Sequence, residues 1–235
     1  MILAKQSLPP YSYLKSPIIT LHIGPQSLQT TLSAHRALLS RSPLFNSALE
    51  TSQGSSTITL QDEDIDAVSA VLEYLYTGEY FPPKSPSGNG LVPHPSISAM
   101  DTSGTQLLHH AKVYTLAEKL GLPTLKLLSH SKIHLISSTA SAELVYARYV
   151  YQHTSREDAT IRKPVASFWG QRSHVLRHET EGDFRKMCLE YPEFAFDVLS
   201  FVLDVEEKRE RRHTVGHEGT PGGDGKGRKR VRADR

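Results

Sequence analysis

Histidine is the residue type in this sequence with the most obvious capacity for chemistry. The chain has 12 histidines, and the pairs His130/His134 and His174/His178 are each four residues apart. This spacing places both rings of a pair on one face of a helix, as in zinc metalloproteases, where a glutamate directly follows the first histidine. Ser131 and Val175 occupy that position here. Because no set of Cys or carboxylate ligands lies nearby at a suitable spacing, we expect surface or hydrogen-bonded histidines and no metal site.

Other catalytic patterns are incomplete. The single cysteine, Cys188, lies between Met187 and Leu189 in a predicted amphipathic helix, and we expect a small buried apolar residue there rather than a nucleophile. A phosphate-binding loop in the glycine-rich tail would need Gly where Thr220 stands and Ser or Thr where Gly227 stands. The acidic run 62–64 is explained by helix capping. We therefore predict a protein that is not an enzyme and that has no cofactor.

A basic cluster near the end of the sequence is the one charged motif with a functional interpretation. It favours a nuclear import signal or a contact with a phosphate backbone, and the equally weighted alternative is a solvated, disordered terminus. The tail lacks aromatic residues for base stacking, so we do not expect selective binding of RNA or single strands. The candidate residues are Lys226, Arg228, Lys229, Arg230 and Arg232.

Charge and composition limit what the rest of the chain does. Residues 206–235 hold ten Lys or Arg against six Asp or Glu, so the formal net charge of +2 becomes −2 for residues 1–205. That part has no overall basic field to attract nucleic acid. One cysteine excludes an internal disulfide, and no apolar run is long enough for a signal sequence or a membrane span. We expect an intracellular protein, nuclear or cytoplasmic, with the basic tail favouring the nucleus.

The elements that must position these residues are read from hydrophobic periodicity. Ile58 and Leu60 alternate with threonines and predict a short strand, which leads into a helix with apolar residues at Ile65, Val68 and Leu72. The acidic run 62–64 supplies N-cap oxygens and Gly78 a stop. Further strands are expected at 18–23 and 28–32, and further helices at 35–39, 43–49, 106–120, 122–134, 139–152, 157–177, 183–190 and 192–212.

Two local features complete this prediction. Residues 81–105 are rich in Pro, Ser and Gly, and we expect a flexible insertion there, because few apolar side chains offset the entropy of ordering it. Thr154 and Glu157 have the spacing of a capping box at a helix start. An apolar stripe from Phe194 to Val205 should pack on residues around Phe168–Trp169 and Val175–Leu176.

Taken together, several segments resemble the BTB/POZ domain, in particular its fungal type. They are 17–24, 35–39, 42–45 and 74–80, with 111–125 similar to the helix pair that closes that fold. The resemblance implies an α+β BTB/POZ fold, a small sheet of short strands capped by helices, and then an all-α helical extension. It gives an N-terminal arm at 1–16, the domain at 17–135 with the insertion at 81–105, the extension at 136–212 and a disordered basic tail at 213–235.

The resemblance also implies function. It predicts a non-catalytic module for association with itself or other proteins, as a scaffold or adaptor, without Kelch, MATH or zinc-finger modules. Two alternatives stay open: a Cullin-3 ubiquitin-ligase adaptor, for which Ala48-Leu49-Glu50 is a poor binding motif, and a nuclear or chromatin factor that uses the basic tail. Family dimers often use an N-terminal strand and the first helix. Many members pair an Asp with the basic residue after the signature His, but Ile18 stands there, which leaves Arg36 without that partner.

The residues expected to carry the fold by this resemblance are a signature histidine, a set of core residues and a stop glycine. They are His35, Leu38, Leu39, Phe45, Leu72, Leu75, Tyr76 and Gly78. We expect His35 to be packed under the domain and hydrogen-bonded for structural reasons.

Overall fold

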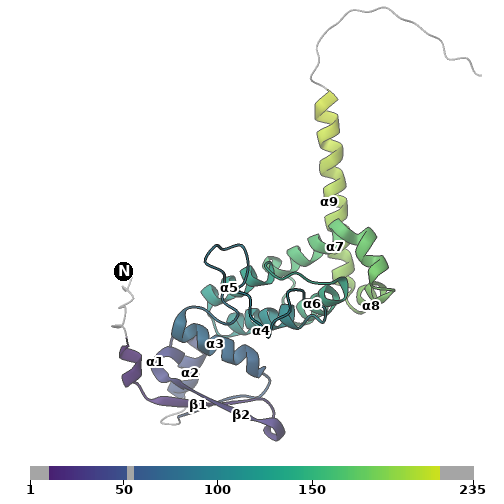
Figure 1. The fold of residues 1–235 in the computed structure, drawn as a ribbon. Helices are drawn as coiled ribbons and strands as arrows, with labels where there is room; N and C mark the ends of the chain where they lie inside the picture. The colour runs from purple at the N-terminus through teal and green to yellow at the C-terminus, as the bar shows by residue number, and fades with distance from the viewer. Residues whose placement is uncertain (1–10, 52–55, 218–235) are drawn as a thin grey trace, which may run out of the picture.

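A small sheet lies at one end of the molecule and helices form the rest (Figure 1). The computed structural model describes residues 11–51 and 56–217 of the chain, and the side chains only as far as residue 212. The elements are η1 (Ser12–Lys15), β1 (Ile18–Ile23), η2 (Gln26–Leu28), β2 (Thr30–His35), α1 (Arg36–Leu39), α2 (Pro43–Thr51), β3 (Thr57–Leu60), α3 (Ile65–Thr77), α4 (Thr105–Lys119), α5 (Pro123–Ile133), α6 (Ala140–His153), α7 (Ala159–Glu179), α8 (Asp183–Glu190) and α9 (Pro192–His217).

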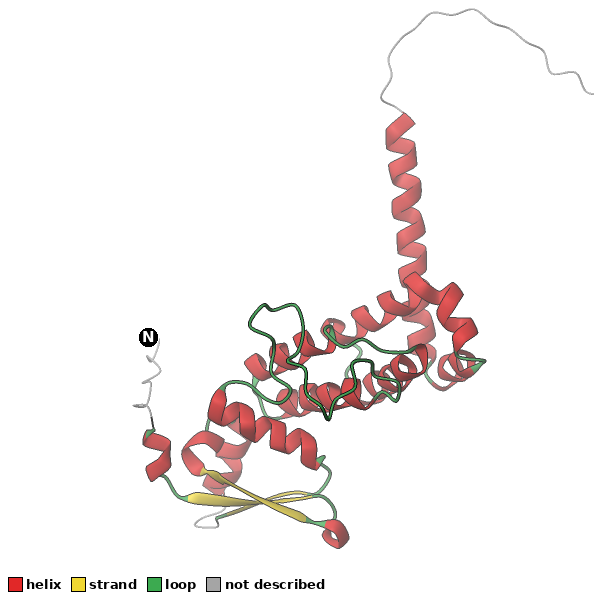
Figure 2. Ribbon diagram, viewed as in Figure 1, coloured by secondary structure: helices red, strands yellow, loops and turns green. Residues whose placement is uncertain are grey.

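The sheet has the strand order β2-β1-β3. Strand β1 pairs antiparallel with β2, with Ile18 opposite His35, and parallel with β3. Alternate residues of β1 are buried, because helices α1, α2 and α3 cover one face of the sheet (Figure 2). The second strand begins two residues later than predicted and runs to His35, since η2 occupies residues 26–28 and leaves Leu28 79% exposed.

Helix α3 begins and ends as its sequence predicts. The Asp64 side chain accepts hydrogen bonds from the backbone N–H groups of Asp66 and Ala67, at 3.1 and 3.0 Å. Gly78 follows the last turn in the left-handed conformation, with φ of 81°, where a residue without a Cβ carries no steric penalty. The acidic run 62–64 thus contains one capping residue, and that carboxylate also binds the Lys112 ammonium of α4 at 2.6 Å.

Helix α4 contributes to two hydrophobic cores. Val113, Leu116 and Ala117 belong to the first core, together with the sheet, α1–α3 and Leu125 of α5. Leu107 and Tyr114 belong to the second core, which α6–α9 complete. A helix that is apolar on two faces must be covered on both, so α4 joins the two cores instead of closing one of them.

The second core is dominated by aromatic rings. Trp169 of α7 is fully buried and contacts Phe184 of α8 and Phe194 of α9, with ring centroids 5.3 and 6.1 Å apart. Phe201 of α9 packs against Gly170. The predicted packing of the α9 stripe on residues 168–169 is therefore confirmed. The prediction that Val175 packs against this stripe is wrong, because Val175 is 44% exposed and does not join this core.

The capping box predicted at 154–157 is wrong. Thr154 ends α6, where its hydroxyl donates to the Val150 carbonyl at 2.7 Å and accepts from Arg162 Nε at 3.2 Å. Helix α7 begins at Ala159, with Asp158 as the preceding residue, so it starts two residues after the predicted position. The sequence spacing fits a capping box, but the buried Arg162 guanidinium needs acceptors and takes the Thr154 hydroxyl and carbonyl.

The segment 81–105 has no named strand or helix before α4, but specific contacts fix its two ends. Near the first end, the buried Lys132 ammonium donates to the carbonyls of Tyr80 and Pro82. At the second end, Asp101 is 2% exposed and its carboxylate accepts from the N–H groups of Gly104, Gln106 and Leu107. The expectation of a loop without fixed structure overlooked this buried cap, whose carboxylate satisfies the first N–H groups of α4.

Within the residues that the structure describes, no helix is both long enough and apolar enough to cross a bilayer.

Candidate functional site

Three aromatic rings meet where β2 ends. Tyr13 comes from η1, His35 is the last residue of β2, and Tyr76 lies in the last turn of α3. The ring centroids are 5.7 to 5.8 Å apart and all three pairs meet edge to face. This is the geometry that aromatic quadrupoles favour, so the three rings form one cluster, which we call the aromatic cluster.

Hydrogen bonds fix the orientation of His35 in this cluster. The Tyr76 hydroxyl accepts from the backbone N–H of His35 at 3.1 Å and lies 2.7 Å from His35 Nδ1. The Nδ1 contact is a second hydrogen bond to Tyr76, and its donor depends on the tautomer of the imidazole. His35 therefore links the end of the sheet to α3, which is a structural role, as the sequence predicts.

Exposed apolar side chains lie on the elements around the aromatic cluster. Tyr11 is 70% exposed, Leu14 56%, Ile18 51% and Tyr76 38%. Ile18 is the cross-strand partner of His35, and Leu14 is in the same short helix as Tyr13. Together, Tyr11, Leu14, Ile18 and Tyr76 form what we call the aromatic surface. A group of large apolar residues on a solvent-exposed face is typical of a surface that binds another protein.

The basic residue at this surface has no acidic partner within the described ranges. Arg36 follows His35 and begins α1, and no ion pair involves its guanidinium in the part of the chain that the structure describes. The residue opposite His35 on the neighbouring strand is the apolar Ile18. A partner surface for this region is therefore mainly apolar, with one cation at its border.

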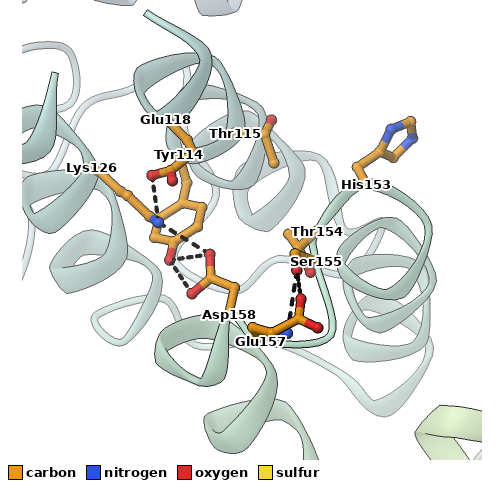
Figure 3. A pocket seen from close by; sticks show the side chains of 9 residues that line it. All are labelled: Tyr114, Thr115, Glu118, Lys126, His153, Thr154, Ser155, Glu157 and Asp158. Carbon is orange, nitrogen blue, oxygen red and sulfur yellow. Dashed lines mark hydrogen bonds and ion pairs between the residues drawn. The ribbon is translucent and has the colours of Figure 1, made fainter. Parts of the chain in front are cut away.

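A second candidate is the polar crevice between α4, α5 and the α6–α7 connection (Figure 3). Its volume is about 370 Å³. Lys126 forms ion pairs with Glu118 at 2.5 Å and with Asp158 at 3.1 Å, and its ammonium lies 4.8 Å from the Tyr114 ring centroid. The Tyr114 hydroxyl donates to the Asp158 carboxylate at 2.9 Å.

These contacts connect α4 and α5 to the α6–α7 connection. Burial, followed by the Asp158 carboxylate, raises the pKa of Tyr114 to about 12. The pKa of Lys126 is raised as well, because its ion pairs outweigh the opposing effect of burial. Both groups therefore keep their protons and hold their partners at neutral pH.

The residues singled out for metal or nucleophile chemistry do not assemble into a site. His130 and His134 have their Nε2 atoms 3.1 Å apart, but the described part of the chain has no group of three or more His, Cys, Asp or Glu that could hold a metal. His174 and His178 are exposed. Cys188 is partly buried, and burial raises the pKa of its thiol, which disfavours the reactive thiolate.

The predicted core residues are buried with one exception. Leu38, Leu39, Phe45 and Leu75 are at most 2% exposed, and Leu72 is 8% exposed. Tyr76 was expected in the core, but it is 38% exposed. It follows the buried stripe of α3 by one position, so its ring leaves the core and its hydroxyl reaches His35. The five basic residues of the tail candidate lie outside the described residues.

Sequence reasoning missed three side chains that matter most in the structure. Tyr13 completes the aromatic cluster from a segment without clear periodicity. Lys132 and Glu143 are charged residues that are buried, at 0% and 9% exposure. The other buried positions of their helices are mostly apolar, as expected. A signal existed for the last two, since Lys132 and Glu143 fall at positions where the apolar stripe of their helix predicts a buried residue.

Comparison with known proteins gives one positive result. Residues 19–90 match the family of the BTB/POZ domain. The match covers the sheet except Ile18, together with α1–α3, His35 and Tyr76, and it ends within the 81–105 segment, before α4. No curated protein matches the chain.

Proposed function

Because residues 19–90 form a BTB/POZ domain, a protein–protein interaction module, and a helical region follows it, we propose that this chain is a non-catalytic docking protein whose domain associates through the aromatic surface. The single observation that carries this proposal is the exposure of Tyr11, Leu14, Ile18 and Tyr76 around a rigid aromatic cluster. The first partner to consider is a second copy of the chain, in line with the use of the N-terminal strand and first helix by family dimers.

The energetics of this surface favour association. Burying a large aliphatic or aromatic side chain contributes about 1.5 to 3 kcal/mol relative to leaving it in water. The cluster is already held by ring packing and the His35–Tyr76 hydrogen bonds, so few side chains must be ordered when a partner binds. A mainly apolar surface with a fixed centre is typical of an interface hot spot.

The test is the mass of the full chain in solution, measured by sedimentation over a range of concentrations. We expect the wild type to dissociate on dilution and Ile18→Lys to be at least about tenfold weaker in self-association, because a second cation near Arg36 would enter the interface. Leu28→Lys is the matched control, since Leu28 is more exposed and lies at the other end of the sheet. Circular dichroism establishes that both variants fold. Equal association of wild type and Ile18→Lys would contradict the proposed surface.

The extension provides the second surface that a scaffold or adaptor needs. Phe196, Leu199 and Leu203 of α9 are each more than half exposed, on the side of the helix opposite Phe194. A protein that binds there while the BTB/POZ domain is occupied would be connected to the domain's partner through this chain. That arrangement is what supports a scaffold or adaptor role.

The two alternative functions stay predictions. The segment Ala48-Leu49-Glu50, considered above as a Cullin-3 binding motif, lies in α2. Its Leu49 is 3% exposed, so the segment presents no apolar side chain to a partner in this conformation. The nuclear or chromatin role depends on residues 226–232, which lie outside the described residues. Replacing Lys229, Arg230 and Arg232 while following localisation tests that role, and unchanged nuclear entry would exclude an import signal there.

A further inference from the structure

A cavity lies between the end of α5, the start of α4, and helices α6 and α7. Its volume is about 400 Å³, which falls within the range of small-ligand sites. Its walls combine polar side chains with apolar ones that belong to the second core or pack against it. They include Leu107, Ile133, Ile136, Val165 and Phe168. This cavity is separate from the aromatic surface and from the Lys126 crevice.

One polar group in this cavity is a buried carboxylate. Glu143 of α6 is 9% exposed and accepts a hydrogen bond from the Ser138 hydroxyl. In the described part of the chain, no cation lies within ion-pair distance of it. Burial, and to a lesser degree the neighbouring Asp101 carboxylate, raises the pKa of Glu143, while the Ser138 hydrogen bond and Arg172, which also lines the cavity, oppose this rise. The buried Glu143 carboxylate makes its end of the cavity favourable for a positive charge.

A second polar group is the Tyr146 hydroxyl, one helical turn after Glu143. Tyr146 is 4% exposed and lines the same cavity. Among the described residues, no hydrogen-bond partner is found for its hydroxyl. Burial and then the nearby Glu143 raise the pKa of this phenol, so it remains protonated. As a phenol that lines the cavity, Tyr146 can accept a hydrogen bond from a bound ligand.

We propose that this cavity binds an alkylammonium group, with the ammonium donating to the Glu143 carboxylate and the Tyr146 oxygen and the alkyl chain lying against the apolar walls. A lysine side chain of a partner protein and a free aliphatic amine share this chemistry. The ammonium has three donors and no acceptor, which matches two acceptors at one end of the cavity. The proposal stands apart from association through the aromatic surface.

The charge distribution favours a cation with an aliphatic stem over an anion or a neutral apolar molecule. An anion would face the buried Glu143 carboxylate. A neutral hydrocarbon would leave the carboxylate and the hydroxyl without new partners. Arg172 also lines the cavity, and its guanidinium carbon lies 5.1 Å from the Phe168 ring centroid, a contact that it makes in place of an ion pair with Glu143.

The first experiment compares n-pentylammonium with 1-pentanol, a neutral molecule of nearly the same shape. Titration of the full chain at pH 7.5, followed by two-dimensional NMR, should show saturable binding of the amine with a Kd on the order of 1 mM. The alcohol should bind about tenfold more weakly, because it makes no charge-assisted hydrogen bond. Equal affinities for the two molecules, or no saturable binding of the amine, would overturn the proposal.

Variants connect the binding to the two polar groups. Glu143→Gln keeps an acceptor for Ser138 and removes the charge, and it should abolish the preference for the amine. Tyr146→Phe should weaken amine binding by a few fold. Glu118→Gln in the other crevice is the control and should bind the amine as the wild type does. Melting curves establish that each variant is folded, and unchanged amine binding by Glu143→Gln would overturn the proposal.

A third probe distinguishes the two sources of the ammonium. N-acetyl-lysine-N-methylamide presents the same group on a peptide backbone. If it binds as tightly as n-pentylammonium, the mouth of the cavity admits a lysine side chain of a protein. If only n-pentylammonium binds, the ligand is a free amine. If neither binds, the proposal is overturned. In each case of binding, affinity should fall as the pH falls, because protonation of Glu143 removes the charge that the ammonium contacts.

Discussion

Lys132 shows how a single buried residue holds a loop in this fold. It is 0% exposed, and its ammonium contacts Glu79 at 2.6 Å, the Pro82 carbonyl at 2.8 Å, and the face of the Tyr80 ring at 3.6 Å from its centroid. Burial alone would raise the pKa of Glu79, but the Lys132 ammonium holds it below its usual value. A cation with this many partners is tolerated in the interior because nearly all its donors are satisfied.

Replacing Lys132 by Met should therefore destabilise the protein strongly. The change leaves the Glu79 carboxylate and two carbonyls without their donor, and we expect a loss of about 3 to 5 kcal/mol in the free energy of unfolding. The measurement is the urea midpoint of the full chain. Lys119→Met is the control: Lys119 is half-exposed and pairs with Glu63, so it should lose less than about 1 kcal/mol. Similar midpoints for the two variants would contradict the role given to Lys132.

His110 gives the fold a pH dependence that can be calculated in sign. It is 1% exposed and its Nδ1 lies 2.8 Å from the Tyr80 hydroxyl. Burial, helped by His109 and Lys132, lowers its pKa from 6.5 to about 3. The folded state therefore binds fewer protons than the unfolded state below pH 6.5. The contribution of His110 to the free energy of unfolding is fully present above pH 6.5, and it is lost as the pH falls towards 3.

Between pH 7 and pH 5 the His110 contribution should fall by about 2 kcal/mol. His110→Asn keeps an oxygen that accepts from Tyr80 and does not titrate in this range. The unfolding free energy of this variant should be lower at pH 7 but should change less with pH than that of the wild type. Urea unfolding at the two pH values measures the difference, and parallel pH profiles would show that His110 is not the titrating group.

At the scale of elements, the sequence predicts some helix starts correctly and others wrongly. Helix α3 was predictable because Asp64 directly precedes the apolar periodicity. Helix α7 was misplaced because Thr154 serves the end of α6 and the buried Arg162, a tertiary demand that outweighs a local motif. Asp101 was overlooked because it lies four residues before α4, within a Pro- and Gly-rich segment, and reaches the helix only by folding back.

Asp101 provides a test at this scale. Asp101→Ala should lower stability by about 2 kcal/mol, since three N–H groups at the start of α4 lose their acceptor. It should also speed proteolytic cleavage within residues 84–100, because the segment loses its second attachment. Asp62→Ala is the control, as Asp62 is exposed and is not the cap of α3. Equal protection of the segment in both variants would refute the attachment.

At the scale of the whole molecule, the fold class was predictable, but the way in which α4 joins the two hydrophobic cores was not. The segments that resemble the BTB/POZ domain lie in order along the chain, and hydrophobic periodicity locates most helices after them. Periodicity does not show which neighbour covers which face of α4, because both of its faces are apolar. The aromatic cluster was half predictable: His35 and Tyr76 were candidates, while the contact with Tyr13 arises from tertiary structure alone.

The way in which α4 joins the two cores predicts that the matched region does not fold by itself. A fragment of residues 1–90 ends before α4 and leaves the α3 surface around Val71 and Leu75 without the Val113–Leu116 side of that helix. We expect a poorly dispersed amide NMR spectrum for the fragment and a well-dispersed spectrum with one cooperative unfolding transition for residues 1–217. A stable, well-dispersed 1–90 fragment would show that the first core does not require α4.

The two apolar faces of α4 also bear on how a binding event is felt far from its site. A rod packed tightly on both sides cannot turn or slide without disturbing the side chains of both neighbours. Its Leu107 end lines the amine cavity, and its Val113–Ala117 stretch supports the layer that carries His35 and Tyr76. Occupancy of one location therefore has a mechanical route to the other, and two ligands of this chain should report each other's presence in their dissociation rates.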